Sequence, residues 1–197
     1  MNKFNGKMGS KLTLVMAYDL NKLVGRGNTL PWNIREDLLN FKKTTTSNKN
    51  GNIIVMGFNT LKSFKGRVLP DRVNVVISKN PDAVIKLGYE ISCDPLDLYR
   101  DFNGVVVFET IEMFLNVENI KKQSVFIIGG MALVNYCLDN HLIKEAIITE
   151  IGSDYGIVDG DVVFNASLID YFNKLGVKID EIDTSCGVQL TVYKYHN

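Results

Sequence analysis

The sequence contains few of the residues that characterise several large classes of protein. Among its 197 residues are only three cysteines, an odd number and too few to build a disulfide framework. No apolar run approaches the ~20 residues that are needed to span a bilayer. The first 11 residues are polar and lack the apolar core of a signal peptide. We therefore expect a cytoplasmic protein without a membrane partner, with a flexible leader at residues 1–11 and one domain at residues 12–197.

An excess of charge is absent, and histidine is scarce. The 22 basic side chains are balanced by 22 acidic ones, so there is no electrostatic argument for a nucleic-acid partner. Neither of the two histidines, His141 and His196, lies where a central acid or base is expected. Cys137 and His141 have a spacing that suits a metal, but the sequence offers no second pair of ligands. We therefore predict no metal site and expect Cys137 to be buried.

Hydrophobic periodicity predicts strands that alternate with helices. Short β-branched runs indicate eight strands, the last two as an antiparallel pair. Residues 33–46 are predicted to form a helix, with Asn33 as its cap and Glu36 completing a capping box. These elements predict one α/β domain with a mixed sheet flanked by helices, which binds ligands at the carboxyl ends of its strands. The predicted strands are residues 12–18, 52–56, 73–78, 105–108, 124–128, 145–151, 175–183 and 188–195, and the other predicted helices are residues 59–64, 111–117 and 131–138.

A carboxylate, Asp37, is the clearest candidate for chemistry. It falls in the first turn of its predicted helix and shares a face with Phe41, one turn later. One interpretation is a surface residue near a helix start. The other is a carboxylate in an apolar cleft, which is costly unless something pairs with it. A ligand with two adjacent N–H donors, such as a pterin or a diaminopyrimidine, would supply a two-pronged, charge-assisted partner.

Two strand-to-helix turns contain glycine, Met56-Gly57 and Ile128-Gly129-Gly130. Free N–H groups at helix N-termini suit a pyrophosphate, and glycine allows the backbone to come close. Glycines after a strand are also common in ordinary turns, so this signal is weak alone. Residues 25–30 begin like a dinucleotide fingerprint but lack its third glycine, and therefore fail as a Rossmann signal.

Taken together, these segments resemble dihydrofolate reductase. The resemblance runs from about residue 12 to residue 78 and resumes from residue 125 to residue 164. Thr149 lies on the strand where the family expects it. The matching motifs, in the family's order and spacing, are Leu-Pro-Trp-Asn at 30–33 with Asp-Leu-x-x-Phe-Lys at 37–42, Val-Met-Gly-x-x-Thr-x-x-Ser at 55–63, Leu-Pro-x-Arg-x-Asn at 69–74, and Ile-Ile-Gly-Gly at 127–130.

The resemblance implies both a fold and a reaction. The fold would be a central, mixed and mostly parallel eight-stranded sheet with about four flanking helices and a C-terminal antiparallel strand pair. The enzyme would reduce 7,8-dihydrofolate to 5,6,7,8-tetrahydrofolate by hydride transfer from NADPH, with NADH a less favoured donor. It would be a cytoplasmic monomer that supplies one-carbon metabolism and thymidylate synthesis, and a target of antifolates.

By this resemblance, the catalytic roles fall on three residues. Asp37 would bind the amino group and ring N–H of the pterin, and its burial would raise its pKa. Trp32 would order water beside Asp37, and Thr149 would hydrogen-bond to the carboxylate. Arg72 would bind the glutamate carboxylate of the folate tail, a bidentate task that suits Lys less well. The other implied substrate-binding residues are Val15, Met16, Ala17, Leu38, Phe41, Phe64, Leu69 and Ile128.

The implied cofactor site lies at the two glycine turns and at residues 25–30, which resemble the mobile loop that closes over the nicotinamide. In the family the Gly129–Gly130 peptide bond is cis, which is rare outside proline. The implied cofactor-binding residues are Ala17, Val24, Asn28, Leu30, Gly57, Phe58, Asn59, Thr60, Ser78, Lys79, Gly129, Gly130, Met131 and Ala132.

The chain departs from the family's pattern at several places. Phe58 stands where most members have a basic residue for the adenosine 2′-phosphate, which weakens the expected preference for NADPH. Lys79 or Lys62 could approach that phosphate instead. Val134 replaces a common Tyr near the nicotinamide. Residues 82–103 and 152–161 match poorly, and the sequence assigns them no role.

Two other functions stay open at the level of the sequence. A reductase acting on a riboflavin-pathway pyrimidine would share the fold, but it would not need the pair Asp37 and Arg72. A non-catalytic folate-binding relative would keep the fold without turnover. A scaffold, however, has no physical need for Asp37, Trp32, Thr149 and Arg72 together. Inhibitor competition tests the first alternative, and turnover tests the second.

Overall fold

A computed structural model describes residues 12–48, 51–99, 102–164 and 177–196, so the predicted leader at residues 1–11 lies outside the described residues. The described chain alternates strands with short helices. Its elements are β1 (Leu12–Asp19), β2 (Leu23–Gly25), α1 (Arg35–Thr45), β3 (Asn52–Gly57), α2 (Phe58–Ser63), β4 (Val73–Ile77), α3 (Pro81–Ile85), β5 (Ile91–Ser92), the 3-10 helix η1 (Pro95–Leu98), β6 (Val105–Phe108), α4 (Ile111–Leu115), the 3-10 helix η2 (Ile120–Lys122), β7 (Ser124–Gly129), α5 (Met131–Asp139), β8 (Ile143–Ile151), β9 (Val162–Val163), β10 (Val177–Asp183) and β11 (Gln189–His196).

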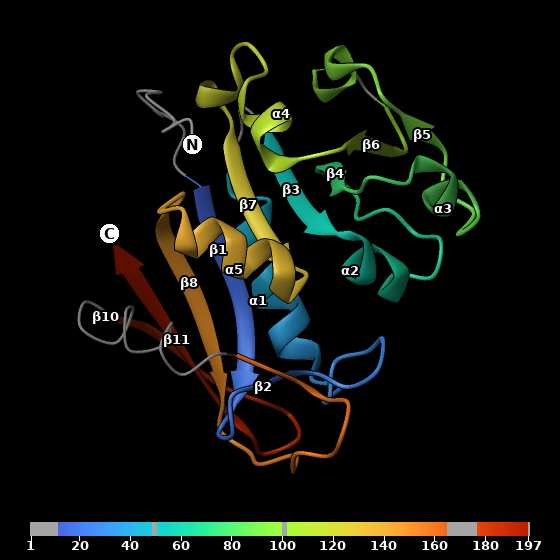
Figure 1. Cartoon of the computed structure of the whole chain (residues 1–197). Coiled ribbons are helices and arrows are strands. Elements are labelled where there is room, and N and C mark those ends of the chain that lie inside the picture. The colour runs from blue at the N-terminus through green and yellow to red at the C-terminus, as the bar shows by residue number, and fades with distance from the viewer. Residues whose placement is uncertain (1–11, 49–50, 100–101, 165–176, 197) are drawn as a thin grey trace.

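The strands form a nine-stranded sheet in the order β10-β11-β8-β1-β7-β3-β4-β6-β5, beside a small sheet of β2 and β9 (Figure 1). The pairs from β8 to β5 are parallel, whereas β11 pairs antiparallel with both β8 and β10. All eight predicted strands therefore form, and the C-terminal pair is antiparallel as predicted. The ninth strand, β5, has only two residues and lies in a region where the sequence shows no clear pattern.

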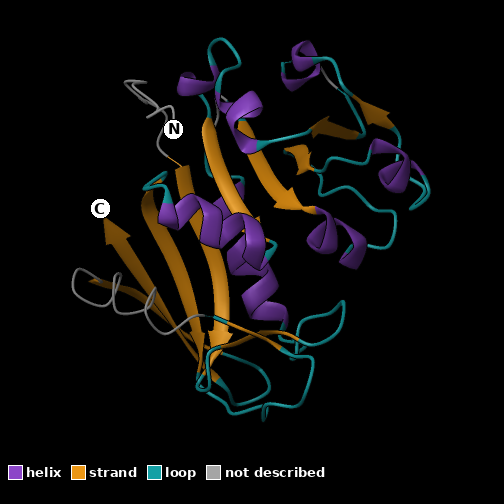
Figure 2. Ribbon diagram, viewed as in Figure 1, coloured by secondary structure: helices purple, strands orange, loops and turns teal. Residues whose placement is uncertain are grey.

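Helices cover both faces of the sheet (Figure 2), with α5 in front of it and α1 behind it in the view of Figure 1. Alternate side chains of β1 pack into the two hydrophobic layers on opposite faces of the sheet. Leu12 and Leu14, both fully buried, pack with α4 and α5, whereas Val15 packs in the second core beneath α2 and α3. The central strand β3 is buried over Asn52–Met56, because a parallel strand covered on both faces has no exposed side. Each fully buried aliphatic side chain contributes roughly 1.5–3 kcal/mol.

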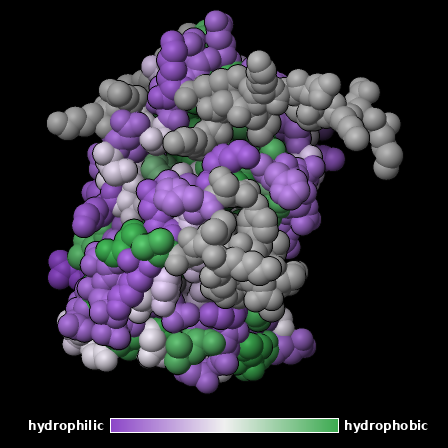
Figure 3. All heavy atoms as spheres, turned by 90° about the vertical axis from the view of Figure 1, so that its left-hand side faces the viewer, coloured by the Kyte–Doolittle hydropathy of each residue, from purple (hydrophilic) through white to green (hydrophobic). Residues whose placement is uncertain are grey.

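The outermost strand, β10, shows the opposite pattern. Most of its side chains are exposed, and Lys178, Asp180, Glu181 and Asp183 carry charge. Charged side chains at a sheet edge oppose pairing with other chains. The side of the molecule on which β10 and β11 lie is accordingly largely hydrophilic, with small hydrophobic patches (Figure 3). Among the described residues, no helix is long and apolar enough to cross a membrane.

The predicted start of the first helix is wrong. The helix α1 begins after Ile34, which makes no side-chain capping bond, and Asn33 is exposed outside it. Glu36 does not complete a capping box, since its Oε1 accepts a bond of 3.0 Å from the backbone N–H of Ser185. Ser185 lies in the turn between β10 and β11, so a tertiary contact replaces the local one. This contact ties the C-terminal hairpin to the first turn of α1.

Candidate active site

The carboxylate of Asp37 is buried between α1 and the sheet. Its residue is only 5% exposed, which excludes the interpretation of an ordinary surface side chain. Trp32 Nε1 donates a hydrogen bond of 2.9 Å to Asp37 Oδ2. Burial raises the pKa of the Asp37 carboxyl above its ordinary value, and the bond from Trp32 lowers it in part. The other oxygen, Oδ1, has no hydrogen-bond donor among the described residues.

Trp32 is itself held rigidly. Its side chain is 5% exposed and packs with Ile34, Ile151 and Leu190, which belong to three different elements or loops. The ring of Tyr155 lies 5.9 Å from the indole, centroid to centroid, at a tilted angle. The indole N–H is therefore aimed at Asp37 by packing on several sides. The resemblance implies that Trp32 orders water beside Asp37, whereas the structure shows a direct bond from Trp32 to the carboxylate.

The expected hydrogen bond from Thr149 to Asp37 is not formed. Thr149 lies on β8 opposite Ala17 of β1 and is 5% exposed. Its hydroxyl accepts a bond of 3.4 Å from the side-chain amide of Asn40, and no bond to Asp37 is present. The physical reason is that Asn40, one turn after Asp37 on α1, stands over the same part of β8. Sequence analysis missed Asn40, which has no local signal of function.

Arg72 is fixed at the end of the turn that precedes β4. The Asn74 side chain braces this turn, because it accepts from the N–H of Leu69 and donates to the carbonyls of Leu69 and Arg72. Arg72 Nη1 donates to Thr45 Oγ1 at 2.7 Å, and its guanidinium lies 5.8 Å from the centroid of the Phe41 ring. Burial lowers the pKa of the guanidinium. Thr45, fully buried in α1, was also missed by sequence analysis.

The structure brings most, but not all, of the apolar residues predicted to surround the substrate into one cluster. One apolar cluster on the α2 side of the sheet brings together Val15, Phe41, Phe64, Leu69 and Ile128. Ala17 packs in the neighbouring cluster that holds Trp32. The prediction is wrong for the side chain of Met16, which packs into the core on the opposite face because successive strand residues alternate. Leu38, on α1, is 49% exposed and belongs to neither cluster.

The two glycine turns meet at the carboxyl ends of β3 and β7. A Cβ on Gly130 would lie 3.1 Å from the Cα of Gly57, and a Cβ on Gly129 would lie 3.0 Å from Thr60 Oγ1. Gly129 and Gly130 have φ values of +141° and +79°, which other residues rarely adopt. The cis peptide bond expected between them is absent, because every described peptide bond is trans and positive φ values shape the turn instead.

These turns present free backbone N–H groups. Gly57 precedes α2 and Gly130 precedes α5, and neither helix start has a side-chain cap. We call these two turns, at Gly57 and at Gly129-Gly130, the cradle. Its uncapped backbone N–H groups can donate to the oxygens of a phosphate. Because the glycines have no Cβ atoms, a phosphate can approach the backbone closely. The donor set therefore fits the pyrophosphate of a dinucleotide.

The other predicted cofactor-binding residues are spread around these turns. Phe58 is partly buried against the α2-side cluster, and Val24 and Met131 pack against the core on the α5 side. The backbone N–H of Ser78 donates to Phe108 at 2.9 Å. Val134 is fully buried and belongs to the core on the α5 side of the sheet. The residues that are exposed are Asn28, Leu30, Asn59, Lys79 and Ala132.

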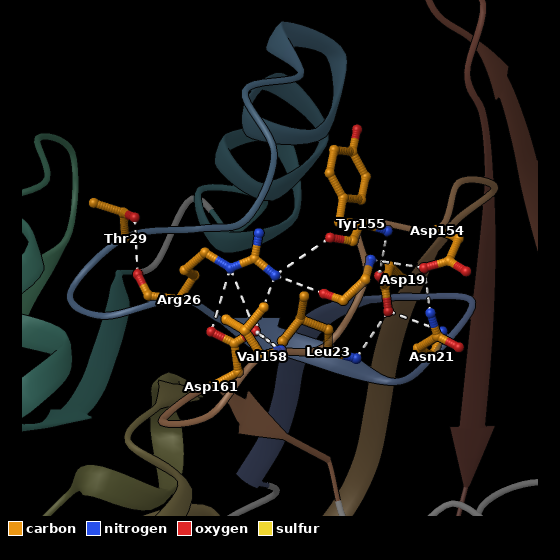
Figure 4. Close-up of polar contacts among 10 residues, drawn as sticks. Asp19, Asn21, Leu23, Arg26, Thr29, Asp154, Tyr155, Val158 and Asp161 are labelled. Carbon is orange, nitrogen blue, oxygen red and sulfur yellow. Dashed lines mark hydrogen bonds and ion pairs between the residues drawn. The ribbon is translucent and has the colours of Figure 1, made fainter.

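The segment that resembles a mobile loop is tied to residues 152–161 (Figure 4). Arg26 Nη2 donates to Asp161 Oδ2 at 2.9 Å and to the carbonyl of Gly156 at 2.6 Å. Beside them the buried carboxylate of Asp19 accepts from the backbone N–H groups of Leu23 at 2.9 Å and Tyr155 at 3.0 Å. Residues 152–161, which the sequence left without a role, therefore hold the loop. Asp19 was missed because its neighbours in the sequence indicate only a turn.

Cys137 and His141, whose spacing would suit a metal, lie in different environments. Cys137 is fully buried, as predicted, and burial raises the pKa of its thiol to about 12. His141 lies past the end of α5 with a φ of +54° and is exposed. In the part of the chain that the structure describes, no three His, Cys, Asp or Glu side chains gather as metal ligands would.

Comparisons with known proteins agree with this geometry. Residues 11–197 match the family model for dihydrofolate reductase. A bifunctional dihydrofolate reductase-thymidylate synthase of Paramecium tetraurelia is 34% identical over 160 residues, which is 81% of this chain and 29% of that protein. A dihydrofolate reductase of Bacillus subtilis is 32% identical over 122 residues, 62% of this chain and 59% of that protein. The matched stretch thus spans less than two thirds of either relative.

A solved structure shares the fold. Dihydrofolate reductase from Enterococcus faecalis, complexed with NADP(H) and RAB-propyl, superposes with a TM-score of 0.65 at 23% sequence identity. The superposition covers 96% of this chain and 98% of that one. The family model matches residues 11–197, which is nearly the whole length of this chain. The chain therefore belongs to the dihydrofolate reductase family.

Proposed function

We propose that the chain reduces 7,8-dihydrofolate to 5,6,7,8-tetrahydrofolate with NADPH. The observation that carries this proposal is the buried carboxylate of Asp37. One of its oxygens receives the indole N–H of Trp32, whereas Oδ1 has no donor among the described residues. A largely buried carboxylate with one oxygen that receives no donor from the described chain can bind a ligand that supplies N–H donors. The amino group and ring N–H of a pterin are two such donors at adjacent positions.

Binding of the pterin to Asp37 fixes its orientation. Two parallel, charge-assisted bonds to one carboxylate hold a planar ring in one place and favour the ionised form of the acid. The ring would then lie near Val15, Phe41 and Ile128, which form part of one apolar cluster. Apolar walls exclude water from the reacting ring and strengthen the charged contact at its polar edge.

The tail of the substrate would reach Arg72. Its guanidinium is held by Thr45 and the carbonyl of Pro70, beside the ring of Phe41. Because Phe41 belongs to the apolar wall as well, the same side chain joins the pterin region to the tail region. A planar guanidinium fixed in this way suits the α-carboxylate of the glutamate portion of a folate.

The cofactor would bind at the cradle of Gly57, Thr60, Gly129 and Gly130. When bound there, NADPH supplies the hydride, and the overall reaction converts dihydrofolate, NADPH and one proton to tetrahydrofolate and NADP⁺. The chain's own residues hold the phosphates, align the two rings and exclude water. The Enterococcus faecalis relative is complexed with NADP(H), which supports this choice of cofactor. Exposed Lys79, next to Ser78, is the residue that we assign to the 2′-phosphate.

We also propose that the enzyme works as a monomer in the cytoplasm. All the residues assigned to the site, among them Val15, Asp37 and Gly130, belong to one chain, so a second copy is not needed to complete it. The three cysteines, Cys93, Cys137 and Cys186, are free thiols, as is usual in a reducing compartment.

The test is a spectrophotometric assay of purified protein. Absorbance of the reduced nicotinamide is followed with dihydrofolate, using NADPH and NADH in parallel. We expect oxidation that depends on dihydrofolate and a higher kcat/KM for NADPH. A folded protein that binds a diaminopyrimidine antifolate but turns over neither cofactor would instead be a folate-binding relative. A protein that binds no antifolate would contradict the role given to Asp37.

A further inference from the structure

We propose that Tyr89 is a positioning residue for the substrate, whose hydroxyl holds Phe64 in the apolar wall of the site. Tyr89 lies between α3 and β5, within the residues 82–103 to which the sequence assigns no role. The inference rests on the proposed function, since it concerns a wall of the same substrate site. It is carried by two hydrogen bonds from the Tyr89 hydroxyl to the backbone on either side of Phe64.

These two bonds close a loop of backbone around Phe64. The Tyr89 hydroxyl donates to the carbonyl of Leu61 at 2.9 Å and accepts from the backbone N–H of Gly66 at 3.1 Å. Leu61 lies in the last turn of α2, and Gly66 lies in the turn that follows this helix. Phe64 lies between them, and its own N–H donates to the same Leu61 carbonyl at 3.0 Å. One hydroxyl therefore ties the backbone before Phe64 to the backbone after it.

The turn after α2 needs a partner from outside itself. Lys65 and Gly66 have φ values of +52° and +80°, so the chain leaves the helix through two successive left-handed residues. This conformation is uncommon for a residue that has a side chain. The N–H groups of Lys65 and Arg67 donate to backbone carbonyls of the same segment. That of Gly66 donates instead to the Tyr89 side chain, so the position of the turn depends on this tyrosine.

Tyr89 is itself held in a fixed place. It is 5% exposed and belongs to the apolar cluster on the α2 side of the sheet, with Val84 of α3 and with Phe64. The next residue along the chain, Glu90, accepts a backbone bond of 2.9 Å from Val105 at the start of β6. Burial raises the pKa of the Tyr89 hydroxyl, which therefore keeps a proton to donate at neutral pH. The hydroxyl thus fixes the turn relative to the sheet.

The segment from Phe64 to Arg72 forms one side of the proposed folate site. Its far end is braced by Asn74, whose side chain donates to the carbonyl of Arg72 at 2.9 Å. Tyr89 braces the near end in the same manner, through the backbone. Phe64 would contact the benzoyl portion of the folate. Loss of the Tyr89 hydroxyl should therefore weaken binding of ligands that have this portion, and leave the contacts of the pterin edge intact.

Tyr89→Phe tests the proposal, because it removes the hydroxyl and keeps the buried ring. Dissociation constants are measured for folate and for a diaminopyrimidine antifolate that has no benzoylglutamate. We expect folate to bind about 3- to 10-fold more weakly, as for one lost hydrogen bond, and the antifolate to bind within twofold of the wild type. In turnover, KM for dihydrofolate should rise similarly, with kcat and KM for NADPH within twofold of the wild type. Equal weakening of both ligands would overturn the proposal.

The matched control is Val84→Ala. Val84 is fully buried in the same cluster, and its truncation leaves both bonds of Tyr89 in place. This variant should lose stability in chemical denaturation without losing affinity for folate. If Val84→Ala weakened folate binding as much as Tyr89→Phe, the effect would be one of general destabilisation and Tyr89 would have no positioning role.

A double-mutant cycle tests the route through Phe64. Phe64→Ala should weaken folate binding by itself, because it removes part of the wall. If Tyr89 acts by placing this side chain, Tyr89→Phe should add less than twofold in the Phe64→Ala background. Losses that multiply in the double variant would show that Tyr89 acts by another route, and would contradict the proposal.

A further readout needs neither substrate nor cofactor. Hydrogen exchange of the Gly66 amide is followed by NMR in the free protein. Tyr89→Phe should speed this exchange by about 10-fold or more, whereas Val84→Ala should change it no more than the amides around it. Unchanged exchange in Tyr89→Phe would refute the bond. Faster exchange with unchanged affinity for folate would show that the bond holds the turn but does not place the wall.

The two proposals can fail separately. A wild-type protein that binds neither folate nor the antifolate would refute the proposed function. A wild-type protein that binds both, with folate bound equally well by Tyr89→Phe, would refute the role of Tyr89 alone.

Discussion

Arg26 and Asp161, 135 residues apart in the sequence, join two loops through a bond of 2.9 Å between Nη2 and Oδ2. The same guanidinium nitrogen donates to the carbonyl of Gly156, and the same carboxylate oxygen accepts from the N–H of Val158 at 3.0 Å. Each charged group thus also satisfies backbone groups of the loop that follows β8. The segment before Pro31 and Trp32 is held by charge rather than by apolar packing.

Asp161→Asn should loosen this loop. Arg26 holds the pKa of the Asp161 carboxyl below its ordinary value, chiefly through their hydrogen bond. A lowered pKa in the folded state means that the contact is fully present above the ordinary value and is lost as the pH falls through the lowered one. At neutral pH we therefore expect Asp161→Asn to be cleaved several-fold faster by trypsin after Arg26, as measured by mass spectrometry. Added salt should speed cleavage of the wild type.

The control for this experiment is Glu181→Gln, which breaks an exposed ion pair with Lys178 on β10. It should leave cleavage after Arg26 unchanged. Equal rates in the wild type and in Asp161→Asn would show that the ion pair does not hold the loop.

Asp37→Asn should raise the stability of the protein and lower its activity. Because burial raises the pKa of Asp37, the folded state binds more protons than the unfolded chain between the ordinary and the raised value. The free energy of unfolding therefore falls as the pH rises through that window. Asn keeps an acceptor for Trp32 without the charge, so the melting temperature at pH 7 should rise. Hydride transfer should fall by about 100-fold or more. A lower melting temperature with near-normal turnover would contradict both roles of the carboxylate.

The sequence predicts most of the strands but only part of the site. Runs such as Ile53–Met56 are apolar at every position because both faces of the sheet are covered, and that pattern is visible without a structure. Asn40 donates a hydrogen bond to a residue 109 positions away, and Asp19 accepts one from a residue 136 positions away, so neither has a local signal. The same is true of Glu36, whose partner Ser185 lies 149 positions away and displaces the predicted capping box.

Thr45→Val should weaken binding of the folate tail. Thr45 Oγ1 accepts from Arg72 and donates to the carbonyl of Phe41 at 2.8 Å. Valine has nearly the same shape but leaves Arg72 Nη1 without this acceptor. We expect KM for dihydrofolate to rise about 5- to 10-fold, equivalent to ~1 kcal/mol, with KM for NADPH unchanged. Lys42→Ala, which breaks an exposed pair with Asp71, is the control. Equal increases in both KM values would argue against a tail site at Arg72.

Gly130→Ala should disrupt the cofactor cradle more than the fold. Its φ of +79° alone would cost about 1–2 kcal/mol for alanine. The added Cβ would also lie 3.1 Å from the Cα and 3.2 Å from the N of Gly57, where backbone cannot yield easily. Gly88→Ala is the matched control, because Gly88 has a φ of +87° and a Cβ there would meet no atom within 4 Å. Both variants should lose stability in chemical denaturation, whereas only Gly130→Ala should lose affinity for NADPH, by about 10-fold or more. If Gly88→Ala lost as much affinity as Gly130→Ala, the effect would be one of general destabilisation, and the two glycine turns would no longer define where the phosphates bind.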